Sequence, residues 1–120
     1  MSRYLYLLRH AESTERLPGE SDKERDLTPA GIREALLVGN YLFKENTSFD
    51  QVICSTAQRA DATARLIADA MKFDPEQISK QDALYEASTR TLFQFILQLD
   101  DQYRRVLCIG HNPSISYLAE

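Results

Sequence analysis

The sequence contains no tryptophan, and it has only two cysteines, two histidines, four glycines and four prolines among 120 residues. It also lacks any apolar run near the roughly 18–20 residues that a helix needs to cross a bilayer, and its N-terminal apolar run is too short for a signal peptide. Basic residues are not in excess, because the formal charge is −4. We therefore expect a protein that neither enters a membrane nor binds nucleic acid, whose phosphate backbone requires a basic surface.

The two cysteines do not form a metal-binding or redox motif. Cys54 and Cys108 lie in or beside short apolar runs, and the sequence has no CxxC pair and no cysteine–histidine cluster. Such thiols are typical of the buried interior of proteins in a reducing compartment. The sequence therefore predicts a cytoplasmic protein without a disulfide.

Short apolar segments alternate with segments of helical periodicity along the chain. Apolar and aromatic residues predict strands over 3–8, 51–54 and 105–109. N-cap residues and apolar repeats predict helices that begin near Thr28, at Ser55 or Thr56, at Ser88 or Thr89, and at Asn112–Pro113. This alternation predicts an α/β fold of three layers, with a mostly parallel sheet between helices.

The apolar positions of the helices predict their buried faces. These are Ile32, Ala35, Leu36, Gly39, Leu42 and Phe43 in the first helix, Ala60, Ala64, Ile67 and Met71 in the second, and Leu92, Phe93, Ile96 and Leu99 in the third. The fourth helix has only two turns, and three strands are few for an open sheet. We therefore expect residues 1–120 to form one domain that is incomplete at its C-terminus.

Two segments are expected to be loops. Residues 11–27 are polar and far longer than the roughly 2–6 residues that usually connect a strand to a helix, which indicates a functional loop. We interpret the mixed charges of residues 20–26 as a solvated stretch rather than a recognition patch. Residues 75–88 form the second loop, with Leu84 and Tyr85 as anchors, and the second helix ends at Asp74–Pro75.

Both histidines follow a predicted strand. His10 comes after the first strand and His111 after the third, and the carboxyl ends of parallel strands meet at one edge, where ligands bind. Arg9 and Arg59 belong to the same edge. Guanidinium groups bind phosphoryl oxygens, and nearby positive charge favours the neutral, nucleophilic imidazole. The set therefore predicts phosphoryl chemistry in which a histidine forms a covalent intermediate.

Four motifs carry a resemblance to a known family. They are LRHAES, RDLTPAG at residues 25–31, STAQRADATA at residues 55–64 and IGHNP at residues 109–113. In this order they resemble the signatures of the histidine phosphatase superfamily, which has the phosphoglycerate-mutase-like fold. The short chain, without lid-like insertions, resembles the small SixA-like branch of phosphohistidine phosphatases. The resemblance implies a hydrolase that uses no metal or other cofactor and acts on a phosphorylated protein or a small phosphoester. The sequence does not determine the oligomeric state, and we expect a monomer.

The resemblance also implies roles for individual residues. His10 is the expected nucleophile, Arg9 and Arg59 the groups that hold the phosphoryl oxygens, and His111 a further donor. Glu86 lies where the family often carries its general acid, although a surface carboxylate explains it equally well.

Two further positions bear on the phosphate site. Ser13 is a candidate phosphate contact. Ala11 departs from the family, in which glycine is usual, and alanine disfavours a positive φ. If that glycine serves a close backbone approach, the loop after His10 must lie slightly differently here.

Several alternatives stay open. A cysteine phosphatase would use Cys54 and Arg59, but only four residues separate them where that class has five. A metal hydrolase would use both histidines, which lack matching carboxylates. Three further alternatives are a small-molecule phosphomonoesterase, a phosphoglycerate-mutase-like enzyme, and a non-catalytic module that binds phosphate or a phosphoprotein.

Overall fold

The computed structural model of the protein describes residues 3–112 and 114–119. Its sheet contains four parallel strands in the order β1-β4-β2-β3. The strands are β1 (Tyr4–Arg9), β2 (Gln51–Ser55), β3 (Ile78–Gln81) and β4 (Arg105–Gly110). The α-helices are α1 (Pro29–Lys44), α2 (Gln58–Met71), α3 (Thr89–Leu97) and α4 (Ser114–Ala119), and short 3-10 turns span Asp22–Glu24, Pro75–Gln77 and Asp82–Leu84.

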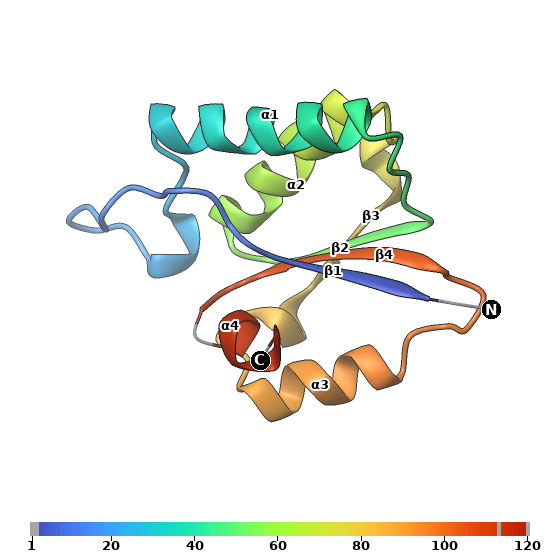
Figure 1. Cartoon of the computed structure of the whole chain (residues 1–120). Helices are drawn as coiled ribbons and strands as arrows, with labels where there is room; N and C mark the ends of the chain where they lie inside the picture. The colour runs from blue at the N-terminus through green and yellow to red at the C-terminus, as the bar shows by residue number, and fades with distance from the viewer. Residues whose placement is uncertain (1–2, 113, 120) are drawn as a thin grey trace.

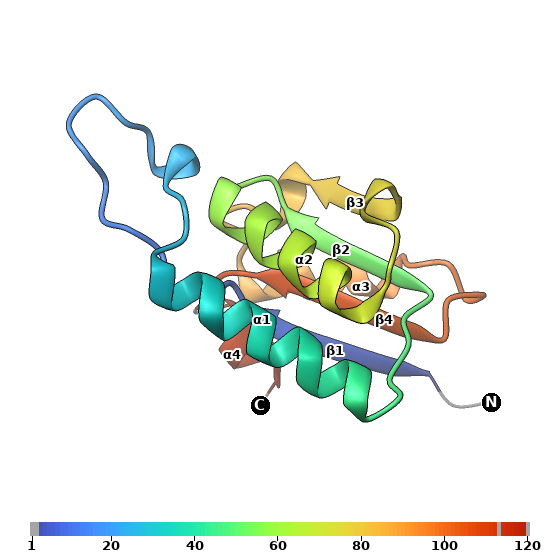
Figure 2. The same cartoon turned by 90° about the horizontal axis from the view of Figure 1, so that it is seen from above.

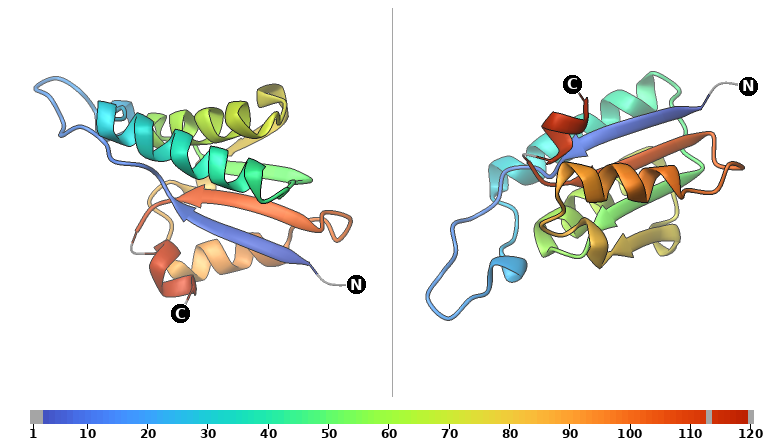
Figure 3. Two further views of the ribbon diagram at one scale, coloured as in Figure 1. Left: turned by 45° about the horizontal axis from the view of Figure 1, so that its top comes forward. Right: turned by 90° about the horizontal axis from the view of Figure 1, so that it is seen from below.

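The elements form three layers, as Figure 1 shows. Helices α1 and α2 cover one face of the sheet, and α3 and α4 cover the other (Figures 1 and 3). Two hydrophobic clusters correspond to these faces, because successive residues of β2 and β4 point to opposite sides: Cys54 and Ile109 pack with α2, whereas Ile53 and Cys108 pack with α3. The α/β fold with a parallel sheet is thus confirmed.

Strand register brings the two histidines to one point. Arg9 of β1 pairs with Gly110 of β4, and the His10 amide donates to the Gly110 carbonyl at 3.1 Å. His10 and His111 therefore leave neighbouring strands side by side at the carboxyl edge of the sheet. The loop over residues 11–27 extends beyond this edge (Figure 2).

Helix α1 begins as predicted but buries a narrower face. The Thr28 hydroxyl accepts the Gly31 amide at 3.0 Å, with Pro29 in the first turn. The buried residues are Gly31, Ala35 and Gly39, whereas Ile32 and Phe43 are 41% and 48% exposed, so their predicted burial was wrong. Small residues let α1 approach α2 closely, which leaves the larger side chains at the rim.

Strand β3 was not predicted from the sequence, and both ends of α2 were misplaced. The sequence of β3, ISKQ, is short and polar, yet this strand pairs in parallel with β2 inside the expected 75–88 loop. The N-cap position of α2 is Ala57, which makes no side-chain capping bond, rather than Ser55 or Thr56, because β2 continues through Ser55. The helix ends at Met71, where Lys72 adopts a left-handed conformation, before the predicted stop at Asp74–Pro75.

The third helix was predicted more accurately. The Ser88 hydroxyl caps α3 by accepting the Thr91 amide at 3.1 Å, and Leu92 is buried. Phe93 is 48% exposed, contrary to the prediction, while Phe95 packs on the core. Pro113, the predicted first position of the last helix, lies outside the described residues. Within the described ranges we find no helix with the length and apolarity to cross a membrane.

Candidate active site

Among the described residues, one ring nitrogen of His10 has a hydrogen-bond partner and the other has none. Its Nδ1 lies 2.8 Å from the Ala11 carbonyl oxygen. Since a carbonyl oxygen only accepts, Nδ1 carries the proton, and Nε2 of the neutral ring keeps its lone pair. Burial lowers the pKa of His10, and the charges of Arg59, Arg9 and Arg25 lower it further against the opposing Ala11 bond. His10 is thus a neutral imidazole with an available Nε2 at neutral pH.

Helix α2 fixes the residue that orients His10. The Ala11 amide donates to the Thr63 hydroxyl at 3.1 Å, and that hydroxyl donates to the Arg59 carbonyl at 2.7 Å. Ala11 is buried, and it is not among the residues with positive φ. The alanine therefore fits its position without backbone strain, and its Cβ joins the core cluster.

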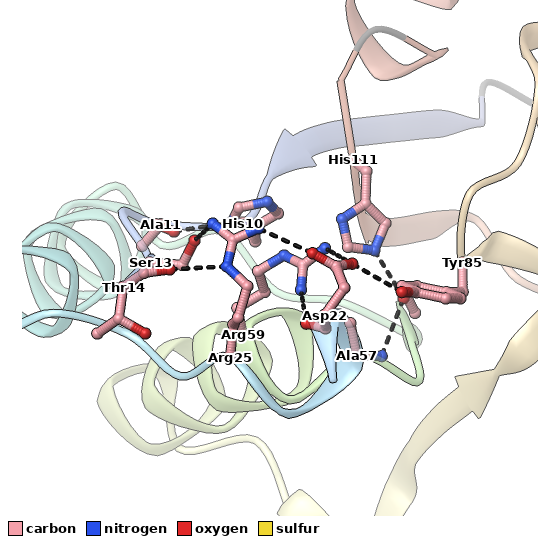
Figure 4. A network of polar contacts seen from close by, with 11 residues as sticks. His10, Ala11, Ser13, Thr14, Asp22, Arg25, Ala57, Arg59, Tyr85 and His111 are labelled. Carbon is pink, nitrogen blue, oxygen red and sulfur yellow. Dashed lines mark hydrogen bonds and ion pairs between the residues drawn. The ribbon is translucent and has the colours of Figure 1, made fainter. Parts of the chain in front are cut away.

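His111 stacks near His10 from the neighbouring strand. The two ring centroids are 5.1 Å apart, with the rings tilted by 60° (Figure 4). Burial first, and the Arg59 charge second, lower the pKa of His111 to about 4. Its Nε2 lies 2.8 Å from the Ser55 hydroxyl. Both imidazoles are therefore neutral at physiological pH, and they lie side by side at the carboxyl edge of the sheet.

Arg59 projects from the first turn of α2 and is only 6% exposed. Its Nη1 donates to the Asp22 carbonyl at 2.7 Å, and its Nη2 contacts the Asp22 carboxylate at 3.0 Å. The Arg59 charge lowers the pKa of both histidines. Figure 4 shows Arg59 in the same group of side chains as His10, Asp22 and His111.

Asp22 lies at the centre of a polar network that the sequence reasoning missed. Besides Arg59, its carboxylate receives Arg25 Nη1 at 2.9 Å and the Tyr85 hydroxyl at 2.7 Å (Figure 4). The Tyr85 bond, followed by that of Arg25, holds the pKa of Asp22 well below its usual range, and the Asp22 carboxylate raises the pKa of Tyr85 to about 12. The carboxylate thus occupies the guanidinium groups that a phosphoryl group would use.

The interpretation of residues 20–26 as a merely solvated stretch was therefore wrong for Asp22 and Arg25. Arg25 also donates to the Thr14 carbonyl at 2.7 Å and to the Ser13 hydroxyl at 3.0 Å. These bonds tie both ends of the long loop together beside His10. The one available signal was that the RDLTPAG motif begins with Arg25.

Arg9 and Glu86 lie further from this network. Arg9 is exposed, and its Nε contacts the His10 carbonyl at 3.4 Å. It flanks a cavity of about 130 Å³ on the α1 side of His10, lined by Leu8, Arg9, His10, Ala11, Glu34, Ala35, Val38 and Thr63. Glu86 is exposed with φ of 54°, and it is the preceding Tyr85 whose ring meets His111, at 5.7 Å between centroids.

The cysteine alternative does not fit the structure. Cys54 and Cys108 are buried, and burial raises the pKa of each thiol to about 12. A thiol that stays protonated and inaccessible is a poor nucleophile. Among the described residues, no three histidine, cysteine, aspartate or glutamate side chains gather in a way that would hold a metal ion.

The chain is similar to several known proteins. The family model of the histidine phosphatase superfamily (branch 1) matches residues 5–92. Uncharacterized protein Rv1276c of Mycobacterium tuberculosis (strain ATCC 25618 / H37Rv) is 39% identical over 114 residues, which cover 93% of this chain and 67% of that protein. The mitochondrial serine/threonine-protein phosphatase Pgam5 of Drosophila ananassae is 36% identical over 77 residues, which cover 64% of this chain and 26% of that protein.

Solved structures share the fold. A crystal structure from Agrobacterium tumefaciens, described as a phosphohistidine phosphatase SixA, superposes with a TM-score of 0.90 at 30% identity and covers 100% of this chain and 76% of that one. The protein histidine phosphatase SixA complexed with tungstate superposes with a TM-score of 0.85 at 23% identity, over 96% of this chain and 73% of that one. The second likeness concerns the fold alone.

Proposed function

Because the chain belongs to the histidine phosphatase superfamily, we propose that this phosphatase acts through a covalent phosphohistidine on His10 and that its substrate is phosphohistidine in a protein. The observation that carries the mechanism is the bond between His10 Nδ1 and the Ala11 carbonyl at 2.8 Å. That bond leaves the Nε2 lone pair free, beside His111 and Arg59, at the carboxyl edge of the sheet.

The reaction proceeds in two displacements at phosphorus. His10 Nε2 attacks the phosphorus atom, and the bond to the leaving nitrogen or oxygen breaks, with its electron pair going to the leaving group. A leaving imidazole already carries a proton on its other ring nitrogen, whereas a leaving oxygen takes one from solvent water. Water then attacks the phosphoryl group, the N–P bond breaks, and inorganic phosphate leaves with His10 neutral again. Guanidinium donors and His111 stabilise the charge on the phosphoryl oxygens in both transition states.

The phosphoryl group must displace the Asp22 carboxylate or share its partners. Both Nη atoms of Arg59 and one of Arg25 contact Asp22. A phosphoryl dianion brings more charge and more acceptor oxygens than one carboxylate, so it competes for these donors. Arg9, exposed beside His10, supplies a further guanidinium, and Ser13 takes part through Arg25.

The electrostatics of the crevice support a substrate with a good leaving group. Asp22, the carboxylate at the centre of the network, is held ionised by its hydrogen bonds and therefore does not protonate a leaving group. Phosphohistidine satisfies this condition, because its imidazole leaves with its own proton and needs little help from a general acid. The 30% identity to a protein described as SixA supports the same substrate class. The similarity to Pgam5 favours phosphoserine or phosphothreonine as the second candidate.

The test compares turnover of a phosphohistidine protein with that of a phosphoserine peptide and p-nitrophenyl phosphate. We expect the wild-type chain to hydrolyse the phosphohistidine protein fastest and to form an acid-labile, base-stable phosphoenzyme. The His10→Ala variant should lose both turnover and phosphoenzyme. Lys72→Ala, which changes a residue at the far end of α2 from the site, serves as the matched control. Full turnover by His10→Ala would reject the covalent mechanism, and faster turnover of phosphoserine would reject the substrate.

A further inference from the structure

The hydroxyl of Ser55 is the hydrogen-bond partner of His111 Nε2. Ser55 is the last residue of β2 and is fully buried, at 0% exposure. Its Oγ accepts the Ala57 amide at 3.1 Å and lies 2.8 Å from His111 Nε2. The proposed function assigns no role to this side chain.

Counting protons decides the direction of the contact with His111. A hydroxyl has one hydrogen and two lone pairs. One lone pair of Ser55 Oγ takes the Ala57 amide, and among the described residues its only other polar contact is His111 Nε2. If Nε2 also donated to Ser55, the buried hydroxyl hydrogen would have no acceptor, which costs about 1–3 kcal/mol. The hydroxyl therefore donates to Nε2, which carries no proton.

We propose that Ser55 is a positioning residue that fixes His111 as the tautomer protonated at Nδ1. Figure 4 shows that the nitrogen of His111 that does not meet Ser55 lies on the side of the ring toward His10 and Asp22. In this tautomer an N–H group points to the side of the ring on which His10 and Asp22 lie, where the proposed function places the phosphoryl group. In the opposite tautomer a lone pair would face the phosphoryl oxygens and repel them.

The two histidines thus carry their protons in a complementary arrangement. His10 is protonated at Nδ1 toward a carbonyl and attacks with Nε2, whereas His111 is unprotonated at Nε2 and donates from Nδ1. Ser55, Arg59 and Thr63 lie four residues apart along one stretch of chain. Ser55 contacts His111, and Arg59 binds Asp22. Thr63 binds the amide of Ala11, whose carbonyl contacts His10. This inference rests on the proposed function for its catalytic meaning, but the tautomer itself does not depend on turnover.

The tautomer can be measured directly, because the chain has only two histidines. We would label them with ¹⁵N in protein without a histidine tag, assign the rings with His10→Ala, and record ring nitrogen shifts at neutral pH. Protonated Nδ1 and unprotonated Nε2 in His111 are expected in the wild type. Protonated Nε2 in the wild type would overturn the proposal.

The Ser55→Ala variant tests the positioning role. We expect it to shift His111 toward a mixture of tautomers and to lower kcat/KM about 10- to 100-fold, the loss typical of a weakened charge-assisted hydrogen bond. Ser79→Ala removes a half-buried hydroxyl from the neighbouring strand β3 and should change neither readout. Unchanged kcat/KM in Ser55→Ala, with turnover abolished in His10→Ala, would refute the role of Ser55 alone. Turnover retained in His10→Ala would instead refute the covalent mechanism.

Discussion

Single charges around His10 determine the pH at which it stays a nucleophile. Arg25 lies across the long loop from His10, and its charge, like those of Arg59 and Arg9, disfavours the imidazolium form. Arg25 is half-buried and can be changed with less disturbance of the core than Arg59, which is almost fully buried. Burial is the first cause of the lowered pKa of His10, and the acidic limb of the pH profile also responds to these charges.

We predict that Arg25→Gln shifts the acidic limb of kcat/KM toward higher pH. Removing a positive charge makes protonation of His10 easier, so its pKa rises toward 6.5 and activity is lost at a higher pH on acidification. The variant should also bind inorganic phosphate more weakly. The pH–rate profile between pH 4.5 and 8 is the measurement, and Arg90→Gln on α3 is the matched control. A limb that stays in place or moves to lower pH would contradict the charge effect.

Residue identities were easier to predict than their partners. The four groups His10, His111, Arg59 and Arg9 could be found because each follows a strand or opens a helix, and strand ends share an edge. Asp22 could not be found in the same way. Its importance comes from contacts with Arg59 and Tyr85, both distant in sequence, and local charge patterns carry no information about such contacts.

At the level of elements, α1 and α2 are held together by small residues. Gly39 of α1 lies against α2, where a Cβ on Gly39 would come within 2.7 Å of Ala70 Cβ and 3.1 Å of Ile67 Cα. Neither atom belongs to a flexible side chain end. The close approach therefore lies at the C-terminal half of α2, which contains Ile67 and Ala70.

We predict that Gly39→Ala destabilises the protein despite the higher helix propensity of alanine. The propensity gain is about 1 kcal/mol, whereas overpacking of this kind costs about 1–3 kcal/mol. The free energy of unfolding by urea should therefore fall by up to about 2 kcal/mol. Asn40→Ala, one residue further and exposed, gains propensity without a clash and should be neutral or slightly stabilising. Stabilisation by Gly39→Ala would show that the helices can separate at no cost.

Elements differed in how well the sequence specified them. The start of α1 was predictable because Thr28 and Pro29 form a local signal for a helix start. Strand β3 was not, because ISKQ has no apolar alternation and acquires its strand conformation only by pairing with β2. The exposure of Ile32 and Phe43 also depends on the distance between α1 and α2. The small residues of α1 determine this distance, so the spacing of apolar residues along the helix did not predict it.

For the molecule as a whole, folding brings both histidines into an environment that resists protonation. Burial is the first cause for each ring, and Arg59 adds to it. In the unfolded chain the same imidazoles take up a proton near pH 6.5. Because these are the only two histidines of the chain, every imidazole contribution to the pH dependence of folding comes from the candidate active site.

The free energy of unfolding should therefore fall as the pH is lowered from about 6.5 toward 5. The unfolded state binds more protons than the folded state in this window, so stability rises with pH through it. The window ends well above the pKa of Asp22, which lies below 3.8, so this carboxylate stays ionised throughout. Urea unfolding at half-unit pH steps measures the slope. A His10→Gln, His111→Gln double variant should lose most of it, and Gln77→Ala should keep it. An equal slope in the double variant would mean that the imidazoles are as easily protonated in the folded protein as in the unfolded chain, and that the crevice does not hold its nucleophile neutral.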